Sequence, residues 1–299
     1  MRRREFARNT VAASLGVMAV PYAGIGKAVQ PGPRSIQKGI MWGNIAFGTT
    51  ILEKFQAAKA AGFEGVEPMS HLNREEVLKA AKVTGMAIPS VCGSLHGKYS
   101  LSDPDPKVRE LGVEALKVTL EDARAYGADT ILLVPGRVND TVSYDDCWNR
   151  SIAEINKVLP LAAKLGVTIA IENVWNNFLL SPLEAARYID QFNSPQVKFY
   201  FDCGNVLVIG WPEQWIRILG KRIGRIHIKE YSRKIADKQG KWAGFGVALQ
   251  EGDNNWPAIV KALDEIGYQS WATVEQPGGD TPEGLKELCV RLTNILSLK

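Results

Sequence analysis

Eight strand-like segments alternate with eight helix-like segments along this chain, and that alternation limits the folds open to it. The strand-like segments are short apolar, β-branched or aromatic runs at 39–44, 65–68, 88–93, 130–134, 167–172, 197–202, 223–227 and 271–275. Between and after them, apolar residues follow the i, i+3, i+4 spacing of amphipathic helices at 50–61, 75–83, 107–125, 148–165, 182–192, 213–219, 256–266 and 282–298. Strands that alternate with helices pair in parallel.

Eight such units match the size of a closed (β/α)8 barrel, which takes about 250 residues. The alternative is an open doubly wound sheet, which carries a glycine-rich phosphate loop after its first strand, and residues 39–44 contain no such loop. The sequence therefore predicts an α/β protein in which residues 38–299 form a single TIM barrel. Residues 29–37, rich in proline and glycine, are predicted to be a linker.

The first 28 residues have the layout of a twin-arginine signal peptide. Arg3 and Arg4 are followed by Phe6, and an apolar run at 11–20 is too short to span a bilayer. An amphipathic or disordered leader is the alternative. We expect export to the periplasm or secretion, with no stable membrane anchor.

The net charge of the chain comes from this N-terminal segment. The whole chain has a formal charge of +4, and the first 28 residues contain five basic residues against one acidic residue. The remainder is therefore close to neutral. A nucleic-acid partner, which needs a basic surface, is not expected.

Four of the predicted strands end in a side chain that can bind a metal ion. These residues are Glu172, Asp202, His227 and Glu275. Because alternate strand residues face opposite sides, turning these four inward leaves the apolar residue before each of them facing the helices. All four can then meet at the C-terminal mouth of a barrel, where barrel enzymes carry out their chemistry.

Three carboxylates and one imidazole, with no thiolate, form an oxygen and nitrogen donor set. Such a set suits Mn²⁺, Mg²⁺ or Co²⁺ better than a structural zinc. We expect one divalent ion, Mn²⁺ first, with Mg²⁺, Co²⁺ and Zn²⁺ as alternatives. The competing interpretation is a set of buried ion pairs, but three clustered negative charges need a cation to offset their repulsion.

The segments around these residues resemble a known family, the xylose isomerase-like barrels, and within it the sugar (phosphate) isomerase/epimerase branch that includes the tagatose/psicose 3-epimerases. The resemblance covers about residues 38–299. It is carried by the segments IENV at 171–174, FDCGN at 201–205, IHIKEY at 226–231 and TVEQ at 273–276.

This resemblance implies roles for five residues. Glu172, Asp202, His227 and Glu275 are expected to bind one metal ion, and Glu172 and Glu275 to act also as the acid/base pair. One glutamate would take the proton next to a ketone and the other would return one, through an enediolate that the metal stabilises. Arg233 matches an arginine that contacts substrate oxygens in those epimerases.

Other substrate contacts are predicted around the metal ligands. Asn205 stands where the epimerases commonly carry a substrate-binding histidine, and this departure puts the substrate in doubt. Glu67, His96, Lys229 and Trp175 could also line the pocket. For Glu67 and Lys229 the alternative is a structural ion pair, for His96 a loop position, and for Trp175 core packing. The long connection at 232–255 is a candidate substrate lid.

The expected function is a metal-dependent isomerase or epimerase of an unphosphorylated ketose or related sugar, because sugar phosphates are cytoplasmic metabolites. A 3-keto-glycoside lyase would use the same proton abstraction and is the alternative, as is a non-catalytic sugar-binding barrel. A related DNA-repair endonuclease holds three zinc ions with many histidines, whereas this chain has three histidines. The sequence leaves open whether the chain forms a homo-oligomer.

Export makes a direct prediction about the mature N-terminus. Mass spectrometry of the protein from a periplasmic extract should show a chain that lacks Met1 and begins near Ala28. An intact Met1 on protein found in the cytosol would contradict the signal-peptide prediction.

Overall fold

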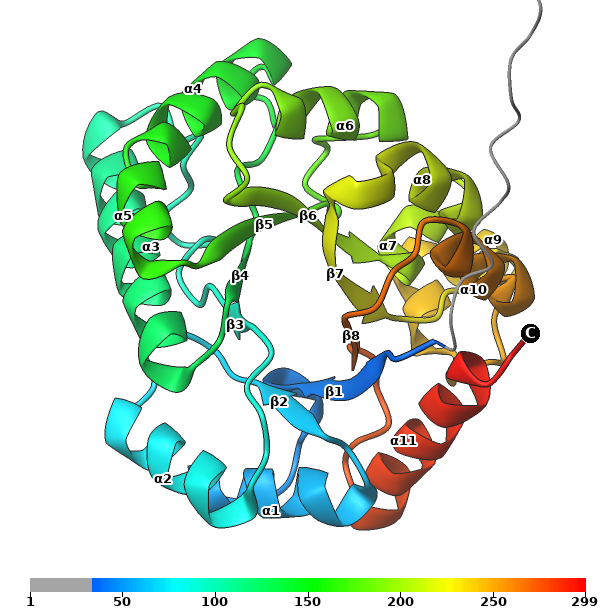
Figure 1. Cartoon of the computed structure of the whole chain (residues 1–299). Helices are drawn as coiled ribbons and strands as arrows, with labels where there is room; N and C mark the ends of the chain where they lie inside the picture. The colour runs from blue at the N-terminus through cyan, green and yellow to red at the C-terminus, as the bar shows by residue number, and fades with distance from the viewer. Residues whose placement is uncertain (1–33) are drawn as a thin grey trace, which may run out of the picture. The chain divides into compact units, whose positions relative to one another are not determined.

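The computed structural model describes residues 34–299, which form a barrel of eight parallel strands with helices around it (Figure 1). The strands are β1 (Gln37–Met41), β2 (Gly65–Glu67), β3 (Val91–Cys92), β4 (Thr130–Leu133), β5 (Thr168–Glu172), β6 (Val197–Asp202), β7 (Ile223–Ile228) and β8 (Trp271–Val274). Their order is β2-β1-β8-β7-β6-β5-β4-β3, with parallel pairing throughout. The predicted TIM barrel is confirmed, whereas the predicted signal peptide at 1–28 lies outside the described residues.

The barrel closes between β2 and β3 through isolated bridges. Cys92 N donates to the Pro68 carbonyl at 2.9 Å, and the other bridge joins Gly65 to Ala87. The predicted strand at 88–93 is reduced to two residues because Pro89 has no N–H to donate. The Pro89 carbonyl instead accepts hydrogen bonds from the guanidinium of Arg225, at 3.1 and 3.3 Å.

The helices cover the outside of the barrel. They are α1 (Ile51–Ala61), α2 (Arg74–Thr84), α3 (Pro106–Tyr126), α4 (Tyr144–Asn156), α5 (Leu159–Leu165), α6 (Pro182–Asp190), α7 (Cys203–Leu207), α8 (Pro212–Leu219), α9 (Arg233–Gln239), α10 (Trp256–Glu265) and α11 (Pro282–Leu296), with 3-10 turns η1 (Trp42–Asn44), η2 (Gly220–Arg222) and η3 (Lys241–Gly246). Within residues 34–299 none of them has both the length and the apolar character to cross a membrane.

The helices differ from the prediction in two ways. The predicted helix at 148–165 is interrupted, because Pro160 could not donate to the carbonyl of Asn156 in a continuous helix. It is tolerated in the first turn of α5, where no partner is needed. The short helices α7 and α9 were not predicted, since each is only one or two turns long and follows a strand almost directly.

Alternate strand residues face two separate clusters, as predicted. The side chains that precede the four strand-end residues pack outward against the helices, and they are Ile171, Phe201, Ile226 and Val274. Inside the barrel, Ala170 and Tyr200 pack with Cys92 and Leu132. The period of two along each strand therefore fixes which residues reach the mouth.

The connection from β7 to α10 contains α9 and η3, and Gln276 ties it to the barrel. The Gln276 amide nitrogen donates to the carbonyls of Phe245 at 3.2 Å and Val247 at 2.6 Å, and its oxygen accepts from Glu230 N at 2.7 Å. The lid function of this connection stays a prediction.

Glu230 holds the second half of the same connection from inside. Its fully buried carboxylate accepts from the backbone N–H groups of Gln250 at 2.9 Å and Asn254 at 3.1 Å, and from the indole N–H of Trp256 at 2.7 Å. One carboxylate therefore replaces the backbone pairing that this irregular segment lacks.

We expect Glu230→Ala to lower the free energy of unfolding by about 3 kcal/mol or more, because several buried donors lose a charged acceptor. Glu251→Ala is the matched control: Glu251 is exposed and pairs with Arg291, so its removal should cost less than about 1 kcal/mol. Urea denaturation of both variants measures the difference. Equal stabilities would show that Glu230 does not anchor the connection.

Candidate metal and catalytic site

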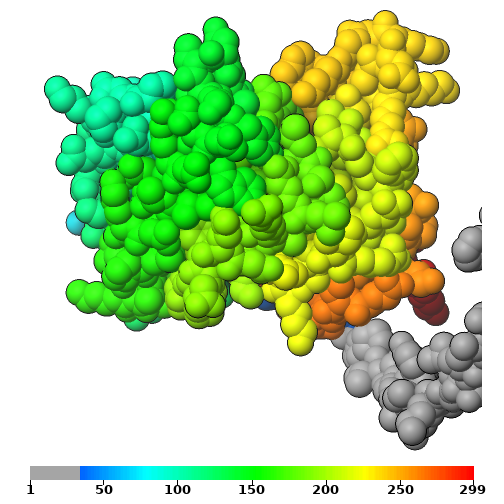
Figure 2. Space-filling model, turned by 90° about the horizontal axis from the view of Figure 1, so that it is seen from above, coloured from blue at the N-terminus to red at the C-terminus, as the bar shows by residue number. Residues whose placement is uncertain are grey.

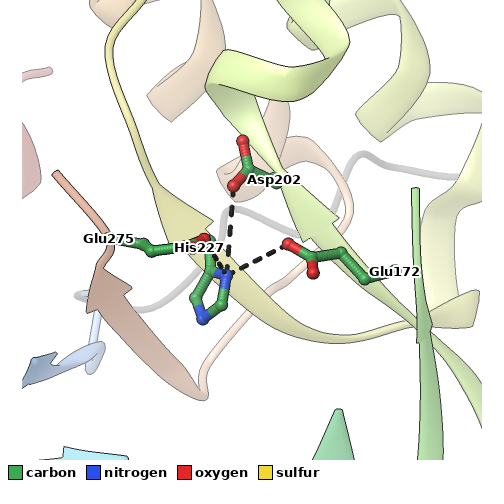
Figure 3. A group of neighbouring side chains, drawn as sticks. All are labelled: Glu172, Asp202, His227 and Glu275. Carbon is green, nitrogen blue, oxygen red and sulfur yellow. Dashed lines mark hydrogen bonds and ion pairs between the residues drawn. The ribbon is translucent and has the colours of Figure 1, made fainter. Parts of the chain in front are cut away.

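The four strand-end side chains converge at one end of the barrel. Glu172 and Asp202 are the last residues of β5 and β6, His227 lies in β7, and Glu275 directly follows β8. Each offers a ligand atom, and these atoms all lie within 4.8 Å of one another (Figure 3). The structure therefore brings together the four residues that were predicted to bind a metal, and their metal-binding role stays a prediction.

A register shift between β6 and β7 helps to bring two of them level. Phe199 pairs with Ile223, whereas the next residue, Tyr200, pairs with Arg225, so that Gly224 is skipped. The shift places Asp202 directly opposite His227. Such irregularities re-aim side chains near active sites.

His227 stands at the centre of the cluster. Its Nδ1 atom lies 2.9 Å from Glu275 Oε2, 3.2 Å from Glu172 Oε1 and 3.9 Å from Asp202 Oδ2. Glu172 and Glu275 approach this nitrogen from opposite sides (Figure 3). The arrangement places three carboxylates around a single imidazole nitrogen.

Glu67 supports the far side of the imidazole. Its Oε1 atom lies 3.3 Å from His227 Nε2, and its Oε2 atom accepts hydrogen bonds from Tyr200 and, at 2.5 Å, from Ser90. Because Nε2 can donate to Glu67, the Nδ1 lone pair is left to face the cluster. Glu67 was predicted as a substrate contact, but it is fully buried behind the imidazole and away from the cavity wall.

Lys229 supplies the positive charge nearest to the carboxylates. Its ammonium nitrogen lies 2.9 Å from Asp202 Oδ2 and 2.8 Å from Glu275 Oε2. Burial alone would lower the pKa of Lys229, but Asp202 and Glu275 raise it above its ordinary value. The side chain also lines the cavity, so it combines the ion pair with the pocket position that were predicted as alternatives.

The two glutamates have opposite pKa shifts. Burial raises the pKa of Glu172 to about 7, against the opposing effect of His227. Burial would also raise the pKa of Glu275, but Lys229 and His227 lower it below its usual range. Without a cation in the cluster, the Glu172 carboxyl therefore holds its proton more readily than the Glu275 carboxyl does.

The cluster fits a divalent cation. Asp202 Oδ2 and Glu275 Oε2 are buried and have no partner with hydrogen-bond geometry among the described residues, although Lys229 is close to both. Oxygen atoms left in this state need positive charge. The donor set of three carboxylates and one imidazole nitrogen suits Mn²⁺, Mg²⁺ or Co²⁺.

Asn205 connects the cluster to Trp175. Its backbone N–H donates to Asp202 Oδ1 at 2.6 Å, and its side-chain oxygen accepts from the Trp175 indole at 3.1 Å. The amide nitrogen donates to the Asn173 carbonyl at 3.2 Å. Trp175 lines the cavity, whereas Asn205 lies behind the wall.

The remaining predicted contacts lie at different depths. His96 lines the cavity, and burial lowers its pKa to about 4. Arg233 is turned away: its guanidinium donates to the carbonyls of Leu207 and Gly210 and lies 4.8 Å from the centre of the Trp211 ring. In this conformation Arg233 does not reach the cavity, so its substrate contact stays a prediction.

The cavity has a volume of about 460 Å³ and reaches well beyond the cluster. Sequence reasoning missed the residues on its outer wall, which include Lys98, Arg137, Asn139 and Asn176. Their signal in the sequence was their place just after predicted strands. It was weak because long βα loops do not fix which side chains face inward.

Glu67→Gln should weaken Mn²⁺ binding by about 10- to 100-fold, because the partner that orients His227 loses its charge. Competition with a chromogenic chelator measures the affinity. Glu75→Gln, on the exposed part of α2, is the matched control and should bind as the unmodified protein does. Unchanged affinity in Glu67→Gln would contradict the positioning role.

Comparisons with known proteins find sequence relatives and solved structures of the same fold. L-ribulose-5-phosphate 3-epimerase of Escherichia coli O1:K1 is 26% identical over 270 residues, which are 83% of this chain and 92% of that protein. An L-ribulose 3-epimerase structure has a TM-score of 0.74 at 20% identity, covering 87% of this chain and 94% of the other. The structure of 3-keto-D-glucoside 4-epimerase from E. coli has a TM-score of 0.73 at 20% identity, covering 87% of this chain and 99% of the other. Residues 55–294 match the model of the xylose isomerase-like TIM barrel family, and the chain belongs to that family.

Proposed function

We propose that the chain is a divalent-metal-dependent sugar isomerase or epimerase acting on an unphosphorylated ketose or a related sugar. One observation carries the proposal: the carboxylates of Glu172 and Glu275 flank His227 Nδ1, at 3.2 and 2.9 Å, within a cavity that a small molecule can enter. The similarity to sugar epimerases of the same fold supports the reaction class.

The proton chemistry is assigned to Glu172 and Glu275. One carboxylate takes a proton from the carbon next to the substrate ketone, and the other returns a proton from the opposite side. A divalent cation held by Glu172, Asp202, His227 and Glu275 would supply positive charge against the charge that develops on the substrate oxygens. We propose Mn²⁺ as that ion, with Mg²⁺, Co²⁺ and Zn²⁺ as alternatives.

Lys229 is proposed to assist at the same place. Its ammonium group lines the cavity and is held between Asp202 and Glu275. From there it can donate a hydrogen bond to a substrate oxygen that gains negative charge, which is a common form of transition-state stabilisation.

The choice of an unphosphorylated substrate depends on the predicted signal peptide. If the chain is exported to the periplasm or secreted, as we propose, it meets free sugars rather than cytoplasmic sugar phosphates. A 3-keto-glycoside lyase is the second candidate, because the cavity extends past the acid/base pair and has room for a leaving group. A non-catalytic sugar-binding role is disfavoured by the presence of every metal ligand and both bases.

Deuterium exchange tests the reaction directly. The Mn²⁺-loaded protein in deuterated water should exchange a carbon-bound proton of at least one sugar in a panel of free pentuloses and hexuloses. Glu275→Gln and Glu172→Gln should each slow this exchange by about 10²- to 10⁴-fold, because general acid–base catalysis contributes that much. Near-normal exchange by Glu275→Gln with Mn²⁺ bound would contradict the two-base mechanism.

Glu251→Gln is the matched control for the two glutamate variants. Identifying the products distinguishes the two candidate reactions. An epimerase converts a ketose to its epimer, whereas a lyase releases the aglycone of a 3-keto-glycoside. The absence of exchange from every sugar in the panel, with Mn²⁺ bound, would contradict the proposed function.

A further inference from the structure

The cavity has an outer half that the proton chemistry does not use. Its inner half is lined by Glu172, His227, Lys229 and Glu275. The outer half is lined by the loops that follow β3 and β4, chiefly through Lys98, Ser102, Asp103, Arg137, Asn139 and Thr141. At about 460 Å³ the whole cavity lies in the range for drug-sized ligands, about 300–1,000 Å³, which are larger than one monosaccharide.

Hydrogen bonds between neighbouring loops fix the walls of the outer half. Ser102 Oγ accepts from Arg137 N at 3.0 Å, which joins the two loops. Asn176 lies in the segment after β5. Its side-chain amide nitrogen donates to the Gly136 carbonyl at 2.6 Å, and its backbone carbonyl accepts from Val138 N at 3.0 Å. The outer half is therefore preformed by three consecutive βα connections.

The raised loops are visible on the molecular surface. Figure 2 shows the yellow-to-orange part of the chain, which contains α9 and η3, raised on one side. A green part is raised on the other side, with a recess between the two.

Some polar side chains on the outer wall have hydrogen-bonding groups without a partner within residues 34–299. Asn176 is only 3% exposed, lines the cavity, and its side-chain oxygen accepts no hydrogen bond. Lys98 and Arg137 are exposed and make no ion pair there, and the Lys98 ammonium lies 4.9 Å from the centre of the Tyr99 ring. The wall thus presents free donors and at least one free, buried acceptor.

This mixture favours a ligand rich in hydroxyl groups. A hydroxyl both donates and accepts, so it can satisfy Asn176 as well as Lys98 and Arg137. A fully ionised phosphate only accepts, so it would leave the Asn176 oxygen unpaired and would meet the carboxylate of Asp103 on the same wall. A second sugar unit matches the wall better than an anion does.

Trp175 is another residue of the cavity wall. It follows Glu172 by three residues and precedes Asn176, and its indole N–H is held by Asn205. Its ring meets Trp242 edge-on at 4.8 Å yet remains 48% exposed. A fixed, half-exposed indole presents an apolar surface to a sugar ring while its polar end is satisfied.

We propose that the outer half of the cavity is a second sugar subsite, and that the substrate is a glycoside whose reacting keto-sugar unit is linked to another sugar. The reacting unit lies at Glu172 and Glu275, and the second unit lies on Trp175, Lys98, Arg137 and Asn176. This inference rests on the proposed function for the identity of the reacting unit.

Calorimetry with matched probes tests the inference on the full-length, Mn²⁺-loaded protein. The probes are four ketohexoses (fructose, psicose, tagatose and sorbose), their 6-O-glucosides, and their 6-phosphates. At least one glucoside should bind about tenfold or more tightly than its parent, which is the gain from one or two net hydrogen bonds. The double variant Lys98→Ala/Arg137→Ala should reduce that ratio by about three- to tenfold.

The control is Lys107→Ala/Arg124→Ala, which removes two exposed cations from α3 outside the cavity and should keep the ratio. Equal binding of glucoside and parent overturns the subsite. Preferential binding of a 6-phosphate overturns it in favour of an anion site. No binding of any probe overturns it as well.

Deuterium exchange run on the same probes keeps the two proposals apart. Exchange without a glucoside preference supports only the proposed function. A glucoside preference without exchange supports only the subsite.

Discussion

The repulsion among three clustered carboxylates, two of them buried, is the constraint on which the barrel mouth depends. Glu172, Asp202 and Glu275 are held around one imidazole nitrogen, where charges interact more strongly than in water. The Lys229 ammonium contacts Asp202 and Glu275, and the His227 imidazole contacts Glu172 and Glu275. Burial and these contacts shift the pKa values of the two glutamates in opposite directions. The same crowding of oxygen atoms suits the cluster to a divalent ion.

Such a cluster needs rigid support, and the structure supplies it from several directions. Parallel strands with a fixed register hold the ligand-bearing residues, and Glu67 fixes the imidazole from behind. Asn205 links Asp202 to Trp175, so the wall of the cavity is coupled to the cluster. Glu230 and Gln276 hold the long connection after β7.

The strand ends could be predicted because strand periodicity is local. An apolar residue before each ligand faces the helices, so the ligand itself must face the barrel, and the packing of Ile171 and Phe201 confirms this. Residues whose contacts join distant segments were less predictable. Glu67 lies behind His227, and Arg233 turns to the carbonyls of Leu207 and Gly210. Neither position follows from spacing, because it is set by contacts between distant segments.

The central claim is that Glu172, Asp202, His227 and Glu275 hold one divalent ion. A crystal of the Mn²⁺-loaded protein, measured at the manganese absorption edge, tests it most directly. We expect a single strong anomalous peak among the three carboxylates and His227 Nδ1. A peak at another place, or none at this cluster under saturating Mn²⁺, would contradict the account.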